Sequence, residues 1–148
     1  MALLVIGSGF GCTGPKSTKE ALELLGFGPC HHINEIVANT DQLPIWQALV
    51  VGKTRDWNGV CDEKSSQVDW PGANFLRHFM VAVPDAKVLP SFRTTEKLWT
   101  GFDRTIGKLL DTYPSMDAPQ SVRDLLDMSG DFMGEKSFND GFATVPPR

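Results

Sequence analysis

The sequence predicts an α/β fold in which helices cover both faces of a mainly parallel sheet, a three-layer α/β/α arrangement. The first observation is a short apolar run, residues 2–6, which leads through a glycine-rich segment into a helical pattern at residues 17–25. The second is that strand-like and helical patterns alternate along the rest of the chain. The third is size, because 148 residues with 41% hydrophobic content suit one compact domain spanning residues 1–148.

The elements after the first helix continue this alternation. Residues 30–37 are predicted to contain a short second strand. Residues 41–51 are predicted to form a helix, and residues 56–63 a further short one. In the first of these two helices the side chains expected to face inward are Leu43, Trp46, Ala48 and Leu49.

The second half of the chain carries the clearest helical patterns. A helix is predicted over residues 71–83, with Pro71 in its first turn, and a strand over residues 87–92 that Pro90 should shorten or bulge. The strongest helix is predicted over residues 95–110, with Thr95 as its cap, and the last over residues 119–133. The apolar positions at helical spacing in the strongest helix are Leu98, Trp99, Phe102, Ile106, Leu109 and Leu110.

The glycine-rich segment, residues 7–17, has the composition of an anion-binding loop. Glycines let the backbone turn and approach a ligand closely, and the helix that follows points unpaired N–H groups and its positive dipole end at the turn. Lys16 adds a mobile cation. The sequence therefore predicts a site for a phosphate or sulfate group.

Two familiar nucleotide patterns fit this loop incompletely. Gly9-x-Gly11-x-x-Gly14 matches a dinucleotide fingerprint, but Glu35 precedes an apolar run instead of ending a second strand, where the ribose carboxylate belongs. A Walker loop needs Lys-Ser directly after its last glycine, and here Pro15 displaces both residues by one position.

A third interpretation rests on resemblance to a family. The segments that carry it are residues 9–22 and 24–32, Asp69-Trp-Pro71, residues 84–88, Arg93 with Glu96, Lys97 and Trp99, and residues 105–109. Together they resemble the bacterial and fungal sulfotransferase-like proteins of the P-loop NTPase superfamily, over nearly the whole chain.

The resemblance implies a P-loop-like fold that binds 3′-phosphoadenosine-5′-phosphosulfate (PAPS) and its product, adenosine 3′,5′-bisphosphate (PAP), without a metal. Lys16 would contact the phosphosulfate, and His32 or Asp69 would deprotonate a small acceptor. These three are the catalytic candidates. The cofactor-binding candidates are Gly9, Gly11, Cys12, Thr13, Gly14, Lys16, Ser17, Thr18, Arg93 and Thr100.

The chain also departs from the pattern of the family. Cys12 stands where relatives usually carry arginine, Pro15 where they have threonine, and Gly101 where a serine usually follows the arginine by eight residues. Relatives also continue beyond residue 148, so the C-terminal part of the fold is expected to be missing. These departures support an alternative from another class, a non-catalytic, decayed module that binds a nucleotide or anion.

Charge and cysteine content set further expectations. A net charge of −4 argues against broad nucleic-acid binding. The three cysteines are odd in number and widely spaced, which favours a reducing cytoplasm. No segment has the pattern of a signal peptide or a membrane span, so no membrane partner is expected. Adjacent His31 and His32 fit no zinc spacing, and an exposed sheet edge leaves a homodimer open.

Overall fold

In a computed structural model, residues 3–133 can be described, apart from the side chain of Asn58, and they form an α/β fold around a four-stranded sheet. The strands are β1 (Val5–Gly7), β2 (Cys30–His31), β3 (Ser66–Gln67) and β4 (Lys87–Leu89). All pairs are parallel, and the order across the sheet is β2-β3-β1-β4. The predicted fold class is confirmed.

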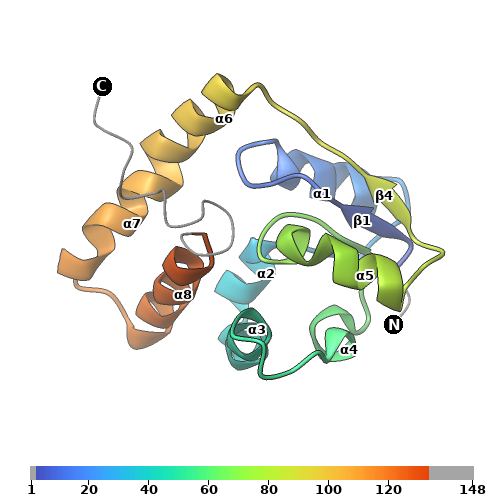
Figure 1. The fold of residues 1–148 in the computed structure, drawn as a ribbon, viewed down its shortest axis with the longest axis horizontal. Helices are drawn as coiled ribbons and strands as arrows, with labels where there is room; N and C mark the ends of the chain where they lie inside the picture. The colour runs from blue at the N-terminus through green and yellow to red at the C-terminus, as the bar shows by residue number, and fades with distance from the viewer. Residues whose placement is uncertain (1–2, 134–148) are drawn as a thin grey trace.

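The helices lie on both sides of this sheet (Figure 1). Helix α1 (Pro15–Leu24) returns the chain from β1 towards β2 on one face. The helices between β2 and β4 lie on the other face, as right-handed crossovers require. They are α2 (Ile33–Ala38), the 3₁₀ turn η1 (Thr40–Gln42), α3 (Leu43–Val50), α4 (Trp57–Cys61), the 3₁₀ turn η2 (Gly72–Phe75) and α5 (Leu76–Ala82).

After β4 the chain runs into a long helical arm that bends around the second face (Figure 1). This arm consists of α6 (Thr95–Phe102), the π segment η3 (Asp103–Gly107), α7 (Lys108–Thr112) and the 3₁₀ turn η4 (Tyr113–Ser115). Helix α8 (Gln120–Asp131) then packs back against α3.

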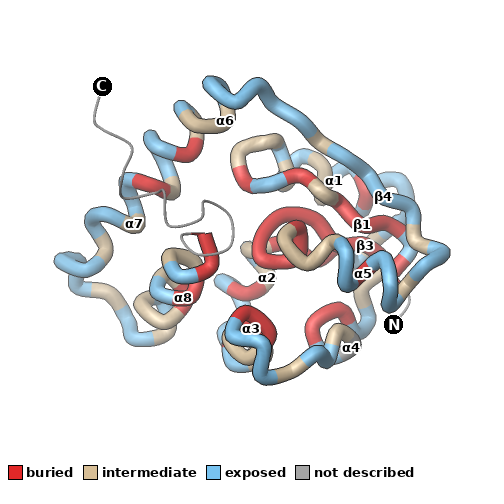
Figure 2. Tube along the Cα trace, viewed as in Figure 1, coloured by how far each residue is buried: buried red, intermediate tan, exposed pale blue. Residues whose placement is uncertain are grey.

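Alternation along the strands separates two buried clusters. Val5 faces α1 and packs with Leu22, Cys30 and Val68 in a small cluster. Ile6, next in β1, points to the opposite face and joins a larger core built from α2, α3, α5, α6 and α8. Burial is therefore concentrated around β1 and β3, with exposed residues along the arm and the β4 edge (Figure 2).

Several predicted elements differ from the observed ones. The last strand stops at Leu89, before Pro90, because proline cannot donate to the ladder. The helix predicted over residues 71–83 begins as a 3₁₀ turn and becomes α-helical only at Leu76. The residue before α6 is Thr94, whose side chain makes no capping hydrogen bond, so the capping role predicted for Thr95 is wrong.

Two elements were absent from the prediction. Strand β3 is two polar residues long, and α2 has only six residues, so neither carries a periodic apolar pattern. Within residues 3–133 no helix is both long and apolar enough to cross a membrane. The predicted loss of the C-terminal part of the fold concerns positions outside the described residues.

Candidate functional site

The site lies at the edge of the sheet where the parallel strands end. The segments that follow β1, β2, β3 and β4 all emerge there, and they carry the glycine loop, His32, Asp69 and Arg93. β1 and β3 are neighbours, yet β1 continues into α1 on one face and β3 into α5 on the other. Such a reversal opens the crevice in which α/β sheets bind ligands.

The glycine loop turns sharply before α1. Cys12 and Gly14 both adopt positive φ angles, 68° and 95°. A Cβ built on Gly14 would meet no described atom within 4 Å, so the loop is open on that side. Pro15 begins the helix, two residues before the predicted start at residue 17, and no side chain caps the helix. The first-turn N–H groups of α1 are therefore available to an anion.

The loop is fastened to the end of β4 through Ser91, which the sequence did not suggest. Thr13 donates its hydroxyl proton to the carbonyl oxygen of Phe10 at 2.6 Å, and its Oγ1 lies 2.8 Å from Oγ of Ser91. Because Thr13 has already donated its proton, Ser91 must be the donor between the two hydroxyls. Gly9 makes room for this contact, since a Cβ there would lie 1.7 Å from the Ser91 hydroxyl.

All three threonines predicted to contact the ligand donate to the main chain instead. The hydroxyls of Thr13, Thr18 and Thr100 donate to the carbonyl oxygens of Phe10, Gly14 and Glu96, respectively. Each hydroxyl has a single proton, so in this arrangement these side chains can only accept. The remaining donors at the loop are the backbone N–H groups other than those of Ser8 and Thr13, which donate to Leu89 and Phe10, together with the Ser17 hydroxyl and the Lys16 ammonium group.

Arg93 faces the glycine loop across the start of the helical arm. A Cβ built on Gly101 of α6 would lie 3.4 Å from Cβ of Cys12 and 3.6 Å from Nη1 of Arg93. Sγ of Cys12 also lies 3.8 Å from Oγ1 of Thr105. The structure thus brings Cys12 of the loop together with Arg93 and Gly101, which lie some 80 to 90 residues later in the sequence.

A positively charged hollow surrounds this meeting point. It is lined by Arg93, Glu96, Lys97, Thr100, Gly101 and Arg104 and has a volume of about 370 Å³. Its three cations form no ion pair within residues 3–133, and neither does Lys16. Although the chain carries a net charge of −4, these cations therefore give this surface a local positive charge.

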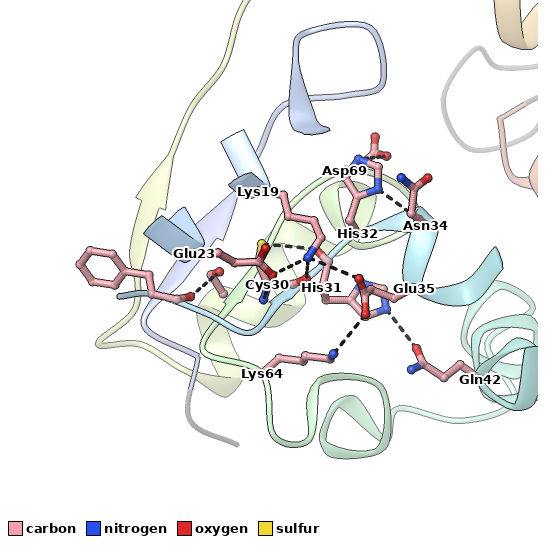
Figure 3. A network of polar contacts seen from close by, with 12 residues as sticks. Lys19, Glu23, Cys30, His31, His32, Asn34, Glu35, Gln42, Lys64 and Asp69 are labelled. Atoms are coloured by element: carbon pink, nitrogen blue, oxygen red, sulfur yellow. Dashed lines mark hydrogen bonds and ion pairs between the residues drawn. The ribbon is translucent and has the colours of Figure 1, made fainter. Parts of the chain in front are cut away.

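His32 and Asp69 form a buried pair beside the loop (Figure 3). Nε2 of His32 lies 3.1 Å from Oδ2 of Asp69, at ion-pair distance but without hydrogen-bond alignment. Nδ1 of His32 accepts the N–H of Asn34 at 3.1 Å, which caps α2. A neutral His32 ring therefore carries its proton on Nε2, facing the carboxylate.

Burial sets the protonation of this pair. It raises the pKa of Asp69 to about 6. Burial also lowers the pKa of His32, and the positive charges of Lys19 and Lys16 act in the same direction, so His32 is neutral at pH 7. The influence of Lys16 on this pKa places the loop lysine and His32 in one electrostatic environment.

Glu35 has a structural role. It lies in α2, where its carboxylate oxygens are 3.3 Å from Nζ of Lys19 and 3.4 Å from Nζ of Lys64 (Figure 3). Lys19 also pairs with Glu23 and donates to the carbonyl oxygen of Cys30 at 3.2 Å. These contacts connect α1 to β2 and α2. They engage both carboxylate oxygens of Glu35, which therefore does not act as the ribose-binding carboxylate of a dinucleotide site.

The positive hollow extends beyond the residues that the sequence singled out as site residues. Lys97 and Arg104 lie on the same helical face as Thr100 and Gly101, and their seven-residue separation is the signal that could have found them. Ser91 left no such signal, because only the fold brings it to Thr13. Among residues 3–133, no group of three or more His, Cys, Asp or Glu side chains could hold a metal ion.

Fold and site together define an α/β protein with a glycine loop, a buried His–Asp pair and a group of cations, unpaired within the described residues, at the carboxyl edge of its sheet. The sulfotransferase domain family matches residues 4–144, and the chain belongs to that family. It is also similar to Ava biosynthesis cluster protein M of Aspergillus versicolor, with 28% identity over 116 residues. That match covers 72% of this chain and 43% of the relative, so the chain spans less than half of that protein.

Proposed function

We propose that this protein binds PAPS and transfers its sulfuryl group to a hydroxyl or amine of a small acceptor molecule. The observation that carries the proposal is the meeting of the glycine loop with Arg93 at Cys12 and Gly101. A nucleotide with a phosphate at each end needs two separate sets of donors at a fixed spacing. The loop with α1 supplies one set, and the hollow around Arg93 supplies the other.

The residues present fit such a ligand. Backbone N–H groups and a lysine suit the phosphosulfate end, because they can surround oxygens that share a negative charge. The guanidinium groups of Arg93 and Arg104 suit a terminal phosphate, since each can donate two parallel hydrogen bonds. The open space at Gly14 leaves room for the ligand to approach the backbone.

When bound, PAPS would supply an activated sulfuryl group with a good leaving group. Lys16 and the first turn of α1 would stabilise charge that develops on the sulfonate oxygens. Asp69 would accept the proton of the acceptor, because neither ring nitrogen of His32 is free to do so. Nδ1 already accepts the N–H of Asn34, and Nε2 already carries the proton of the neutral ring. His32 would then orient the carboxylate.

A non-catalytic nucleotide-binding module is the second candidate, and one observation favours it. Cys12, an uncharged residue, is the loop residue that lies near Gly101 and Arg93. A missing cation at such a point costs on the order of 10²–10³ in rate, whereas one charge-assisted hydrogen bond contributes only about 1.5–3 kcal/mol to binding. Binding can therefore survive where transfer is weak.

Radiolabelled sulfate transfer separates the two candidates. The protein is incubated with ³⁵S-labelled PAPS and a panel of phenols, alcohols and amines, beside Lys16→Ala and Cys12→Arg. Transfer that Lys16→Ala abolishes and Cys12→Arg increases supports the enzyme. Calorimetric binding of PAP without transfer by any variant supports the module, and no binding of PAP, ATP or NAD refutes both.

We further propose that the protein acts as a cytoplasmic protein on a small molecule, without nucleic-acid or membrane partners. All three cysteines are free, which fits a reducing compartment. The exposed β4 edge leaves a homodimer open, and size-exclusion chromatography with light scattering tests it.

A further inference from the structure

Next to the glycine loop lies a small aromatic pocket that shares only Gly11 with the candidate site residues. It has a volume of about 140 Å³ and an almost wholly apolar lining. Its walls are formed by Phe10, Gly11, Trp70, Leu98, Trp99 and Phe102, and Thr95 is, apart from the two tryptophans, the one lining residue with a polar side-chain group. They come from three places in the sequence: the loop, the segment after β3 and helix α6.

Four of these walls are aromatic rings that follow one another around the pocket. The ring centroids of Phe10 and Trp70, of Trp70 and Phe102, and of Phe102 and Trp99 are each 6.0 Å apart. The planes turn from tilted through edge-on, 89°, to nearly parallel, 30°. A flat ring placed among them can meet both faces and edges, which are the arrangements that aromatic pairs prefer.

The size of the pocket limits what fits. An apolar cavity of about 150 Å³ holds one benzene molecule. The pocket therefore has room for one six-membered ring, while a larger group would have to extend through its mouth. An almost wholly apolar lining also disfavours sugars and charged amines, because their polar groups would lose water without gaining partners.

The pocket is connected to the anion site through the backbone. Gly11 belongs to both, and a Cβ on Gly11 would lie 2.9 Å from Cζ3 of Trp70, so glycine is needed for this close contact. Trp70 directly follows Asp69, the proposed base. A ring in the pocket with a hydroxyl at its Gly11 end would place that hydroxyl at the loop.

We infer that this pocket binds the aromatic ring of a phenol-type acceptor, a single ring carrying a hydroxyl. Its role as an acceptor rests on the proposed sulfotransferase function, but the binding of such a ring does not. The hydroxyl oxygen would form the new bond to sulfur while the bond from sulfur to the 5′-phosphate oxygen breaks. The hydroxyl proton would pass to Asp69, and PAP would leave.

Calorimetric titration of the intact protein with phenol tests this inference, with cyclohexanol as a probe of similar size that is not flat. Leu98→Trp fills the pocket, and Leu109→Trp is the matched control, because Leu109 is exposed on the same helical arm and does not line the pocket. We expect phenol to bind more tightly than cyclohexanol. Its affinity should fall at least tenfold in Leu98→Trp and less than twofold in Leu109→Trp.

The same titrations in saturating PAP distinguish the pocket from the nucleotide site. Phenol affinity that PAP leaves unchanged or increases supports an acceptor pocket beside the nucleotide. Loss of phenol binding in PAP overturns the inference, because the pocket would then hold the adenine ring. Equal loss in both tryptophan variants, or no preference over cyclohexanol, also overturns it. Phenol binding without any PAP binding supports the pocket and refutes the proposed function.

Discussion

Replacing Asp69 with asparagine should change how stability depends on pH. Asp69 is only 4% exposed, and burial raises its pKa from 3.8 to about 6. Between these two pH values the unfolded chain releases the proton while the folded chain keeps it. The free energy of unfolding of the wild type should therefore fall as the pH rises from about 4 to about 6. Asparagine mimics the protonated carboxyl group and removes this dependence.

The size of the effect follows from the two pKa values. A rise of about two pKa units, at about 1.36 kcal/mol each, corresponds to about 3 kcal/mol. The difference in unfolding free energy, Asp69→Asn minus wild type, should increase by most of that amount, about 2.4 kcal/mol, between pH 4 and pH 7, because part of it is already lost at pH 4. Comparing the difference at two pH values removes any contact that the substitution itself breaks, because that contribution is the same at both.

Urea denaturation followed by tryptophan fluorescence at half-unit steps from pH 4 to pH 8 measures this difference. Asp85→Asn is the matched control, since it removes the same charge from an exposed site before β4. The assignment of Asp69 as a buried carboxyl group with a raised pKa would be refuted if the difference in unfolding free energy between Asp69→Asn and wild type stayed constant, within about 0.5 kcal/mol, at every pH.

Three further predictions concern the loop and its partners. Gly101→Ser, whose Cβ would make ordinary contacts with Cys12 and Arg93, should stabilise α6 by about 0.5 kcal/mol in thermal unfolding and tighten PAP binding, and weaker PAP binding would contradict it. Ser91→Ala should cost about 1 kcal/mol in urea denaturation, and a neutral result would show that its bond to Thr13 is unimportant. Gly9→Ala should lower the free energy of unfolding by about 1–3 kcal/mol, because its Cβ would lie 1.7 Å from Oγ of Ser91. The loss should be smaller in a Ser91→Gly background, and strictly additive effects in the double mutant would contradict this clash.

The sequence predicted the elements that are determined by residues close together in the chain. Helix α1 follows from glycine, proline and a helical run, and the short β4 follows from Pro90. Strand β3 could not be predicted this way, because its buried residues are Ser66 and Gln67. The hydroxyl of Ser66 is satisfied by the carbonyl oxygen of Phe27, 39 residues away. Such a partner is set by the tertiary structure.

The candidate site likewise contains features that a local sequence pattern predicts and contacts that only the tertiary structure forms. The glycine loop and Lys16 are local features between β1 and α1, although the helix begins at Pro15 and already includes Lys16. The bond from Ser91 to Thr13 and the pairing of His32 with Asp69 join segments separated by tens of residues, so no local pattern contains them. The preference for Asp69 over His32 as the proposed base also depends on a contact seen only in the structure, the hydrogen bond by which His32 caps α2.

The central claim is that the glycine loop and Arg93 hold the two ends of one nucleotide. It is tested most directly by titrating PAP and adenosine 5′-monophosphate, which lacks the 3′-phosphate, into wild type, Arg93→Ala and Lys16→Ala. We predict that wild type and Lys16→Ala bind PAP at least tenfold more tightly than the monophosphate, and that Arg93→Ala binds both equally. A preference for PAP that survives in Arg93→Ala, or equal binding by wild type, would contradict the claim.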